Sequence, residues 1–304
     1  MEVQIHRKSY FKNPEQDHQT FRNWVQKLSE LNGRSYDELS FETSLGKTTV
    51  FAVNKERSYL ETVVIFPGFR TTSLIWDLDK GLDNIGQELR VFMVETNGQP
   101  NLSEGNTPNI NGDGYGHWAA EVIDALNLDK PIVAGASFGG NVSMKLAVHH
   151  PDKVKAVILL NSGCFTFASM GVMGVSILPI INPSRKNINK FLNKGVFYPP
   201  NHQLSNEAHD LLVQYQELAL KYYKDKTQKP RAMVKDLVKN KVPVYMLMGD
   251  KDRLFPVEKN LKVAKKVLGD SLKEVKVLKD VGHGIECHPP AMQYLGEVIE
   301  KVKG

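Results

Sequence analysis

The sequence predicts an α/β fold with a doubly wound, mostly parallel β-sheet. Several short runs are apolar or β-branched on both faces, as are strands of a sheet that is covered on both sides. Segments that resemble helices lie between several of these runs, and such alternation is typical of this fold class. The length of 304 residues suits one large domain or a domain with an insertion. The predicted strands are residues 62–66, 90–94, 131–135, 155–161, 242–249 and 274–278.

The helices between these strands are predicted from apolar spacing. In the segment 116–126, Trp118, Val122 and Leu126 recur every four residues and therefore share one helix face. Similar segments are residues 142–153 and 261–268.

The N-terminal part precedes this alternation. Residues 1–35 are expected to form a helical extension, with a helix near 20–31. A hairpin is predicted over residues 39–53, because Gly46 lies in a short turn between two β-rich runs.

One interval breaks the alternation of strands and helices. From Cys164 to about Asn240 the sequence contains no good strand, and an apolar stretch is followed by amphipathic segments. A stretch of this length cannot be a plain connection between two strands. We therefore predict that residues 164–240, called the inserted segment below, form a mostly helical insertion over one end of the sheet.

Composition and charge exclude several classes of protein. Hydrophobic residues make up 41% and charged residues 24%, and the net charge is +5. The basic runs 221–231 and 261–280 contain acids, which indicates solvated surfaces rather than nucleic-acid binding. Cys164 and Cys287 form neither a disulfide framework nor a metal-binding pattern. The N-terminus resembles no secretory signal, and the apolar stretch 167–181 is too short for a membrane span, so we expect a cytoplasmic protein.

A candidate nucleophile lies between a predicted strand and a predicted helix. Gly135, Ser137 and Gly139 form the pattern G-x-S-x-G after an apolar run. A sharp turn from strand to helix would force Ser137 into an unfavourable backbone conformation, and its neighbours must be small because the two elements crowd there. The serine hydroxyl would then be exposed beside a helix N-terminus, which favours negative charge. The alternative is a plain glycine-rich turn.

A serine nucleophile needs a base and an acid that orients the base. His283 follows the last predicted strand in a glycine-flanked turn and is the predicted base, with His288 as the alternative. Asp250 and Asp252 both follow the strand 242–249, at the end where ligands bind in open α/β sheets. We favour Asp252, because a short turn lets it reach back toward the histidine, whereas Asp250 could pair with a lysine.

The chemistry also needs two backbone N–H groups that face the developing oxyanion. One is expected from Phe138, which follows the serine. The other is expected from Phe69 in the loop after the strand 62–66, where Gly68 would let the backbone approach closely. An ordinary Pro-Gly turn is the alternative interpretation of that loop.

These motifs resemble the α/β-hydrolase superfamily, in the group that has a cap between strands six and seven. The resemblance covers roughly residues 45–304, and Ser137, Asp252 and His283 follow in the family's order. The matching stretches are "PGF" at 67–69, "GASFGG" at 135–140, "GDKDRLFP" at 249–256 and "VGHG" at 281–284.

The resemblance implies a core of residues 1–163 and 241–304, with residues 164–240 as a helical cap. Two departures make lipid-type and dehalogenase-type assignments harder. Pro67 stands where many members have histidine, and residues 95–106 replace the usual D-x-R-G-x-G-x-S loop. A serine nucleophile also argues against the related epoxide hydrolases and haloalkane dehalogenases, which use an aspartate.

The resulting expectation is a serine hydrolase that cleaves a carboxylic ester, thioester or lactone of a small to medium apolar small-molecule substrate through an acyl-enzyme. No metal or organic cofactor is expected. The alternatives are an acyltransferase, a C–C hydrolase or lyase on the same triad, and a ligand receptor with little turnover. An apolar acyl pocket is predicted under the cap, although the same side chains could simply pack the cap. Its predicted lining is Phe165, Phe167, Met170, Met173, Ile177 and Leu178.

Overall fold

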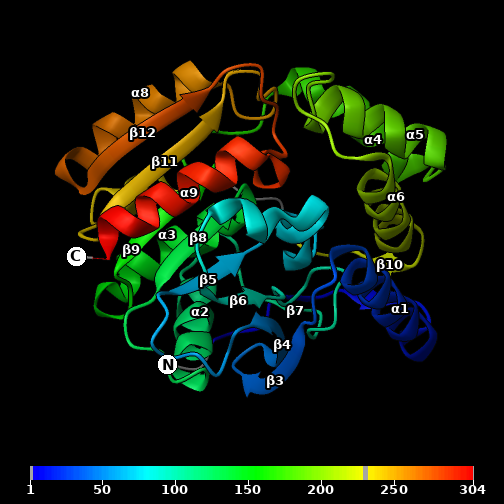
Figure 1. The fold of residues 1–304 in the computed structure, drawn as a ribbon, viewed down its shortest axis with the longest axis horizontal. Coiled ribbons are helices and arrows are strands. Elements are labelled where there is room, and N and C mark those ends of the chain that lie inside the picture. The colour runs from blue at the N-terminus through cyan, green and yellow to red at the C-terminus, as the bar shows by residue number, and fades with distance from the viewer. Residues whose placement is uncertain (1–2, 229–231, 304) are drawn as a thin grey trace.

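The computed structural model describes residues 3–228 and 232–303 and is built around an eight-stranded sheet (Figure 1). Along the sheet the strands run β12-β11-β9-β8-β5-β6-β4-β3. The pairs from β6 to β12 are parallel, whereas β4 pairs antiparallel with both β3 and β6. The strands are β3 (Asp37–Thr43), β4 (Gly46–Val53), β5 (Thr62–Phe66), β6 (Arg90–Val94), β8 (Ile132–Ala136), β9 (Ala156–Leu160), β11 (Val244–Gly249) and β12 (Leu272–Leu278).

Helices cover both faces of this sheet, so the predicted fold class is confirmed. Successive residues of β5 point to opposite faces: Val63 and Ile65 join one apolar core, while Val64 and Phe66 join the other. The first core includes side chains of α9 and of the helical segment η1. The second includes side chains of α2, α3 and α8. These elements are η1 (Ser73–Ile85), α2 (Gly114–Ala125), α3 (Phe138–His149), α8 (Val257–Leu268) and α9 (Pro289–Val302).

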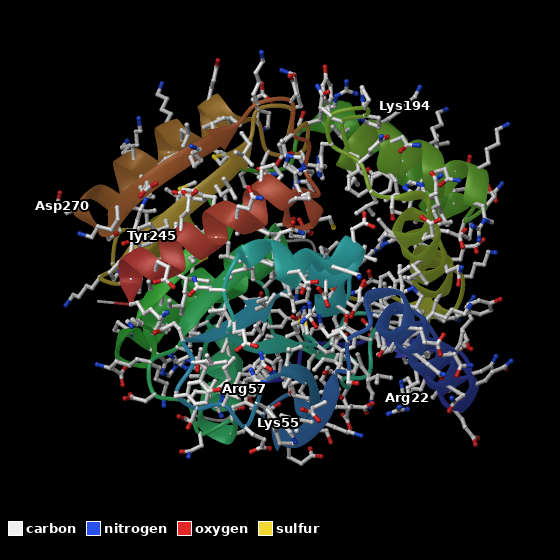
Figure 2. The ribbon with its side chains drawn as sticks, viewed as in Figure 1. Arg22, Lys55, Arg57, Lys194, Tyr245 and Asp270 are labelled. Carbon is white, nitrogen blue, oxygen red and sulfur yellow. The ribbon has the colours of Figure 1, made fainter. Side chains whose placement is uncertain are left out.

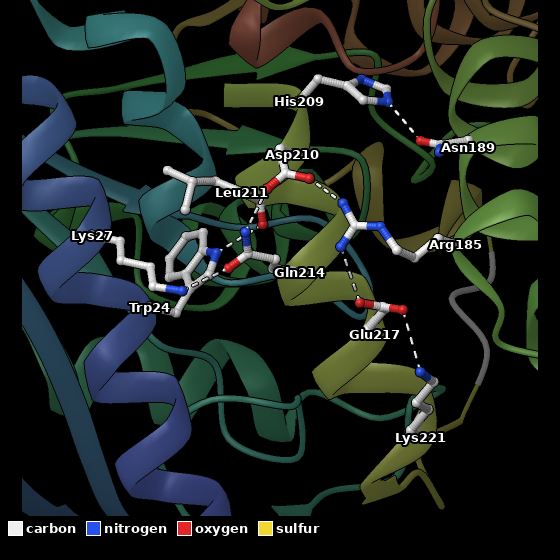
Figure 3. Close-up of polar contacts among 10 residues, drawn as sticks. All are labelled: Trp24, Lys27, Arg185, Asn189, His209, Asp210, Leu211, Gln214, Glu217 and Lys221. Carbon is white, nitrogen blue, oxygen red and sulfur yellow. Dashed lines mark hydrogen bonds and ion pairs between the residues drawn. The ribbon is translucent and has the colours of Figure 1, made fainter. Parts of the chain in front are cut away.

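The N-terminal helix α1 (Pro14–Asn32) packs against α6 (Asn206–Lys221). The indole Nε1 of Trp24 donates to the carbonyl oxygen of Leu211 at 2.8 Å, and Figure 3 shows this contact between the two helices. The predicted hairpin also forms, as the pair β3–β4. The extension is not wholly helical, because two short strands, β1 (Arg7–Lys8) and β2 (Tyr10–Phe11), precede α1.

Within the described residues, four α-helices and the short π-helical segment η3 lie between β9 and β11 in chain order, where the inserted segment was predicted. In Figure 1, α4, α5 and α6 lie together on one side of the sheet, at the upper right. The guanidinium of Arg185 on α5 pairs with Asp210 and Glu217 on α6, as Figure 3 shows. The remaining elements here are α4 (Met170–Ile181), α5 (Arg185–Phe191), η3 (Leu192–Val196) and α7 (Val234–Leu237).

The inserted segment also contains a short strand that the sequence did not predict. β10 (Tyr223–Lys224) pairs antiparallel with β2 near the N-terminus. Two residues carry no periodicity, so such a pair is set by tertiary contact rather than by local sequence.

Charged side chains are dispersed over the surface. Figure 2 shows Arg22, Arg57 and Lys194 on separate parts of the molecule. Arg22 pairs with Glu38, and Arg57 pairs with Glu88. In the described ranges, no helix is long and apolar enough to cross a bilayer.

Candidate active site

Ser137 lies in the turn between β8 and α3 with a strained backbone. Its backbone has φ 49° and ψ −109°, a conformation that residues with a side chain rarely adopt. The Ser137 N–H donates to the carbonyl oxygen of Leu160 at 3.0 Å, and the Ser137 carbonyl accepts from the Gly163 N–H at 3.3 Å. The end of β9 and the loop after it therefore hold the turn in place, and the serine side chain remains partly exposed.

Close packing explains two of the three predicted glycines. A Cβ at Gly135 would overlap the backbone of Gly139, and a Cβ at Gly139 would overlap the carbonyl oxygen of Phe66. Gly68 differs, because a Cβ there would lie 3.7 Å from Ser137 Cβ, an ordinary contact. The loop of Gly68 does lie against the serine, but the available space does not require a glycine at that position.

His283 and Asp252 are in direct contact. The distance from His283 Nδ1 to Asp252 Oδ2 is 2.9 Å, and Asp252 Oδ1 accepts from the N–H groups of Leu254 and Phe255. The Asp252 side chain is fully buried, and 12% of the His283 side chain is exposed. Burial by itself would lower the pKa of His283, but the charge and hydrogen bond of Asp252, with the charge of Glu286, raise it above its ordinary value. This arrangement stabilises an imidazolium and leaves Nε2 to exchange a proton.

The two alternative residues have other partners. Asp250 is exposed, bonds the Lys251 ammonium at 2.8 Å and accepts from the Asp280 N–H at 2.6 Å. His288 precedes α9, and its ring packs edge-on against the ring of His202, with 4.9 Å between the centroids. The structure thus places Asp252, and not Asp250, beside His283.

Asn161 links the parts of the site and was not predicted from the sequence. It follows β9, and its side-chain NH₂ donates to the carbonyl oxygens of Gly282 at 2.9 Å and His283 at 3.0 Å. Its Oδ1 accepts from the Gly249 N–H at the end of β11. The end of β11, which carries the acid, is thereby connected to the histidine turn. Among the described hydrogen bonds, none joins Ser137 Oγ to His283, and such bonds often shorten only when substrate is bound.

The predicted oxyanion loop packs against the start of α3. Phe138 is the first residue of α3, so its N–H has no partner within the helix. The rings of Phe69 and Phe138 meet edge-on, with 6.1 Å between their centroids. The residue after Phe69, Arg70, donates its backbone N–H to Gln99 Oε1 at 2.7 Å and pairs its side chain with Asp225. These contacts fix the loop beside the serine turn.

A buried carboxyl, Glu95, holds the continuation of this loop and was also missed in the sequence. Its Oε1 accepts from the Thr72 hydroxyl at 2.6 Å, and from the N–H and hydroxyl of Ser73 at 2.9 and 2.5 Å. Burial raises the pKa of Glu95 to about 7, although the hydrogen bonds from Ser73 and Thr72 favour the ionised form. Glu95 is the first residue of the segment 95–106, which departs from the family pattern. Through Glu95, this segment anchors Thr72 and Ser73, which continue the loop after β5.

Among the predicted acyl-pocket residues, the four side chains that the structure describes do not form one enclosed lining. Phe165 is buried in the core that includes α3. Phe167, Ile177 and Leu178 lie at the surface, with 66%, 42% and 36% of their area exposed. The surface position of Ile177 and Leu178 follows from the packing of α4, which contacts α5 and η3 but leaves part of its apolar surface uncovered. The side chains of Met170 and Met173 lie outside the described residues.

A cluster of histidines lies at the opposite end of α3. His117 Nδ1 is 2.7 Å from His150 Nε2, and His117 Nε2 is 3.2 Å from the carboxylate of Asp113. Both ring nitrogens of His117 are therefore engaged. Over the described ranges, no group of three His, Cys, Asp or Glu side chains has an arrangement that could hold a metal ion.

Comparison with known proteins identifies hydrolases of this fold. The "Uncharacterized carboxylesterase nap" of Bacillus subtilis is 23% identical over 272 residues, which are 84% of this chain and 83% of that protein. A "2-hydroxy-6-oxononadienedioate/2-hydroxy-6-oxononatrienedioate hydrolase" of a Pseudomonas species is 24% identical over 234 residues, 73% of this chain and 81% of that protein. The crystal structure of naproxen esterase from Bacillus subtilis superposes with a TM-score of 0.75 at 20% identity.

The superposition with naproxen esterase covers 96% of this chain and 99% of that chain, and it shows a shared α/β-hydrolase fold. A family described as "Serine aminopeptidase, S33" matches residues 118–289, more than half of the chain. That range includes Ser137, Asp252 and His283. The chain therefore belongs to the serine aminopeptidase S33 family of α/β-hydrolases.

Proposed function

We propose that this protein is a serine hydrolase that cleaves a carboxylic ester, thioester or lactone of a small to medium apolar acid through an acyl-enzyme. The observation that carries the proposal is the strained Ser137 between β8 and α3, in a chain whose Asp252 and His283 are in direct contact. A strained turn of this kind is maintained where an exposed hydroxyl is needed.

In the proposed mechanism, His283 Nε2 takes the proton of Ser137 Oγ while Oγ bonds to the acyl carbon. Asp252 holds Nδ1–H and stabilises the imidazolium that forms. His283 then protonates the departing oxygen or sulfur, and the acyl group stays on the serine. Water repeats the sequence: its proton goes to His283, its oxygen bonds the acyl carbon, and the proton returns to Ser137 as the acid leaves.

The backbone N–H groups of Phe69 and Phe138 would stabilise the oxyanion of each tetrahedral intermediate. Support for this role comes from the contact between the two rings and from the bonds that Gln99 and Glu95 make to the loop. We also propose that residues 164–240 act as a cap above this site and that the acyl group lies beneath it.

A fluorophosphonate probe tests the nucleophile directly. The folded protein should become covalently labelled and should hydrolyse p-nitrophenyl butyrate. Ser137→Ala should abolish both, because no hydroxyl remains to attack phosphorus or carbon. Mass spectrometry of the labelled peptide, which contains Ser137, locates the adduct, and Ser143→Ala on α3 is the control that should keep full labelling. Folded protein that stays unlabelled would refute the proposal.

Hydrolysis of a C–C bond is the second candidate, because the Pseudomonas relative is named for a dienedioate and a trienedioate substrate. Such dianions need cationic partners, yet Arg70, the residue after Phe69 in the same loop, is already paired with Asp225. We therefore place the ester first. Assaying the dienedioate beside p-nitrophenyl butyrate decides between them, and a higher kcat/KM for the dienedioate would reverse this order.

A further inference from the structure

A histidine of the inserted segment bonds both sides of the turn that carries His283. The ring of His202 is buried, with 1% of the residue exposed. Its Nδ1 accepts from the Gly282 N–H at 2.9 Å, and its Nε2 lies 3.0 Å from the Gly284 carbonyl oxygen. One imidazole thus bonds the residue before His283 and the residue after it.

These two bonds require one tautomer of a neutral ring. Nδ1 must be unprotonated because it accepts from an N–H, and Nε2 must carry the proton because its partner is a carbonyl. Burial, with the nearby rings of His288 and His283, lowers the pKa of His202 to about 4. At neutral pH the ring therefore remains in the form that both bonds need.

Local structure holds His202 against the histidine turn. Tyr198 and His202 exchange two backbone hydrogen bonds of 3.0 Å, which close a tight loop. The ring of His202 packs edge-on against Phe197 at 5.1 Å between centroids. The carbonyl oxygen of Val196 accepts from the Gly284 N–H at 3.0 Å, so backbone and ring contact the turn together.

The glycines beside His283 are explained by this contact. A Cβ on Gly282 would lie 2.5 Å from the carbonyl oxygen of Val196, and one on Gly284 would lie 2.8 Å from Val196 Cγ1. The φ of Gly284 is −74°, a value open to any residue, so close approach and not backbone strain requires glycine there. The "VGHG" motif is therefore shaped by the inserted segment.

We infer that His202 is a positioning residue for His283, through which the inserted segment sets the orientation of the base. This inference rests on the proposed function. Asn161 bonds the carbonyl oxygens of Gly282 and His283 from the sheet side, while His202 bonds the turn from the other side. Asp252 fixes Nδ1 of His283, and the two flanking bonds of His202 fix the backbone from which the ring projects.

The test compares His202→Phe with His202→Asn. Phenylalanine keeps an aromatic ring beside Phe197 but loses both bonds, so kcat for p-nitrophenyl butyrate should fall about 10- to 100-fold with KM nearly unchanged. Asparagine keeps an acceptor near Nδ1 and should lose less than about 10-fold. His209→Phe is the matched control, because His209 also lies near Phe197 but bonds Asn189 (Figure 3).

The pH profile separates positioning from a general loss of stability. Asp252 and Glu286 raise the pKa of His283, while His202, whose ring packs against His288, lies near it as a neutral ring. If the turn relaxes in His202→Phe, His283 moves away from Asp252 and its pKa falls. The acidic limb of kcat/KM should then move to lower pH, and it should stay unchanged in His209→Phe.

Each outcome decides the inference. A folded His202→Phe with wild-type kcat and an unmoved acidic limb would overturn it, as would an equal loss in His209→Phe. If His202→Phe does not fold, His202→Asn decides: a reduced kcat at an unchanged melting temperature supports the inference, and a wild-type kcat overturns it. Wild-type protein that resists the fluorophosphonate refutes the proposed function instead, so the two failures are distinct.

Discussion

At the scale of single residues, two aspartates that are nearly adjacent in sequence have different partners. Asp252 is buried, and both of its carboxylate oxygens are used, one by His283 and one by backbone N–H groups. Asp250 lies at the surface and pairs with Lys251. A buried carboxylate with no lysine or arginine partner is costly unless hydrogen bonds replace its lost hydration, and Asp252 has such bonds to His283 and to the N–H groups of Leu254 and Phe255.

Asp252→Asn should therefore lower kcat by about 10³- to 10⁴-fold, because the amide cannot hold the required tautomer or stabilise the imidazolium. Asp250→Asn should change kcat only a few-fold, since it alters a surface ion pair. Steady-state kinetics on p-nitrophenyl butyrate measure both variants. A larger loss from the Asp250 substitution would contradict this assignment.

At the scale of elements, the crossing of β8, α3 and β5 explains the glycines of the serine turn. Gly139 lies at the start of α3 directly against the backbone of Phe66 at the end of β5. The Phe66 backbone cannot withdraw without disturbing the parallel pairing of β5 with β8. The glycines of the serine turn are thus required by the packing of β5, β8 and α3 as well as by the conformation of the turn itself.

Gly139→Ala should destabilise the fold by about 2–3 kcal/mol or more, because its Cβ would overlap the Phe66 carbonyl and force the helix away from the sheet. Gly68→Ala is the matched control from the same neighbourhood, where a Cβ would meet its nearest atom at 3.4 Å. Urea unfolding compares the two. Equal free energies of unfolding in the two variants would show that crowding does not explain Gly139.

At the scale of the whole molecule, the features that could be predicted from the sequence are those that a local apolar pattern encodes. The six predicted strands were recognisable as apolar or β-branched runs: β5, β6, β8, β9 and β11 are buried, whereas no residue of β12 is buried. The serine, acid and histidine each follow one of these strands. The helix α9 was missed although Met292, Leu295 and Ile299 carry a helical spacing and are buried. Its signal was present, but it follows two prolines and lies after the last expected residue of the site.

Other parts were beyond prediction because no periodic pattern encodes them. The bonds from His202 to the histidine turn join residues far apart in the sequence, and only tertiary packing brings them together. The same holds for Glu95, which looked like a departure from a family motif and proved to anchor Thr72 and Ser73. Contacts of this kind connect the inserted segment and the loops to a core whose strands could be predicted from the sequence.

Glu95 gives the whole molecule a pH-dependent stability. Burial raises its pKa in the folded state to about 7, against 4.5 for an ordinary glutamate. The folded state therefore holds a proton that the unfolded state releases between about pH 4.5 and 7, so this group lowers the free energy of unfolding as pH rises through that window. The shift corresponds to about 3 kcal/mol when complete.

Glu95→Gln should remove this dependence while keeping an oxygen that can accept from Thr72 and Ser73. Relative to the variant, wild-type protein should lose up to about 3 kcal/mol of unfolding free energy between pH 4 and pH 8. Urea unfolding of both proteins across this range measures the difference, in which the contributions of the other titrating groups cancel. Parallel curves would show that the pKa of Glu95 is the same in the folded and unfolded states, because the three hydrogen bonds to Oε1 offset the cost of burial.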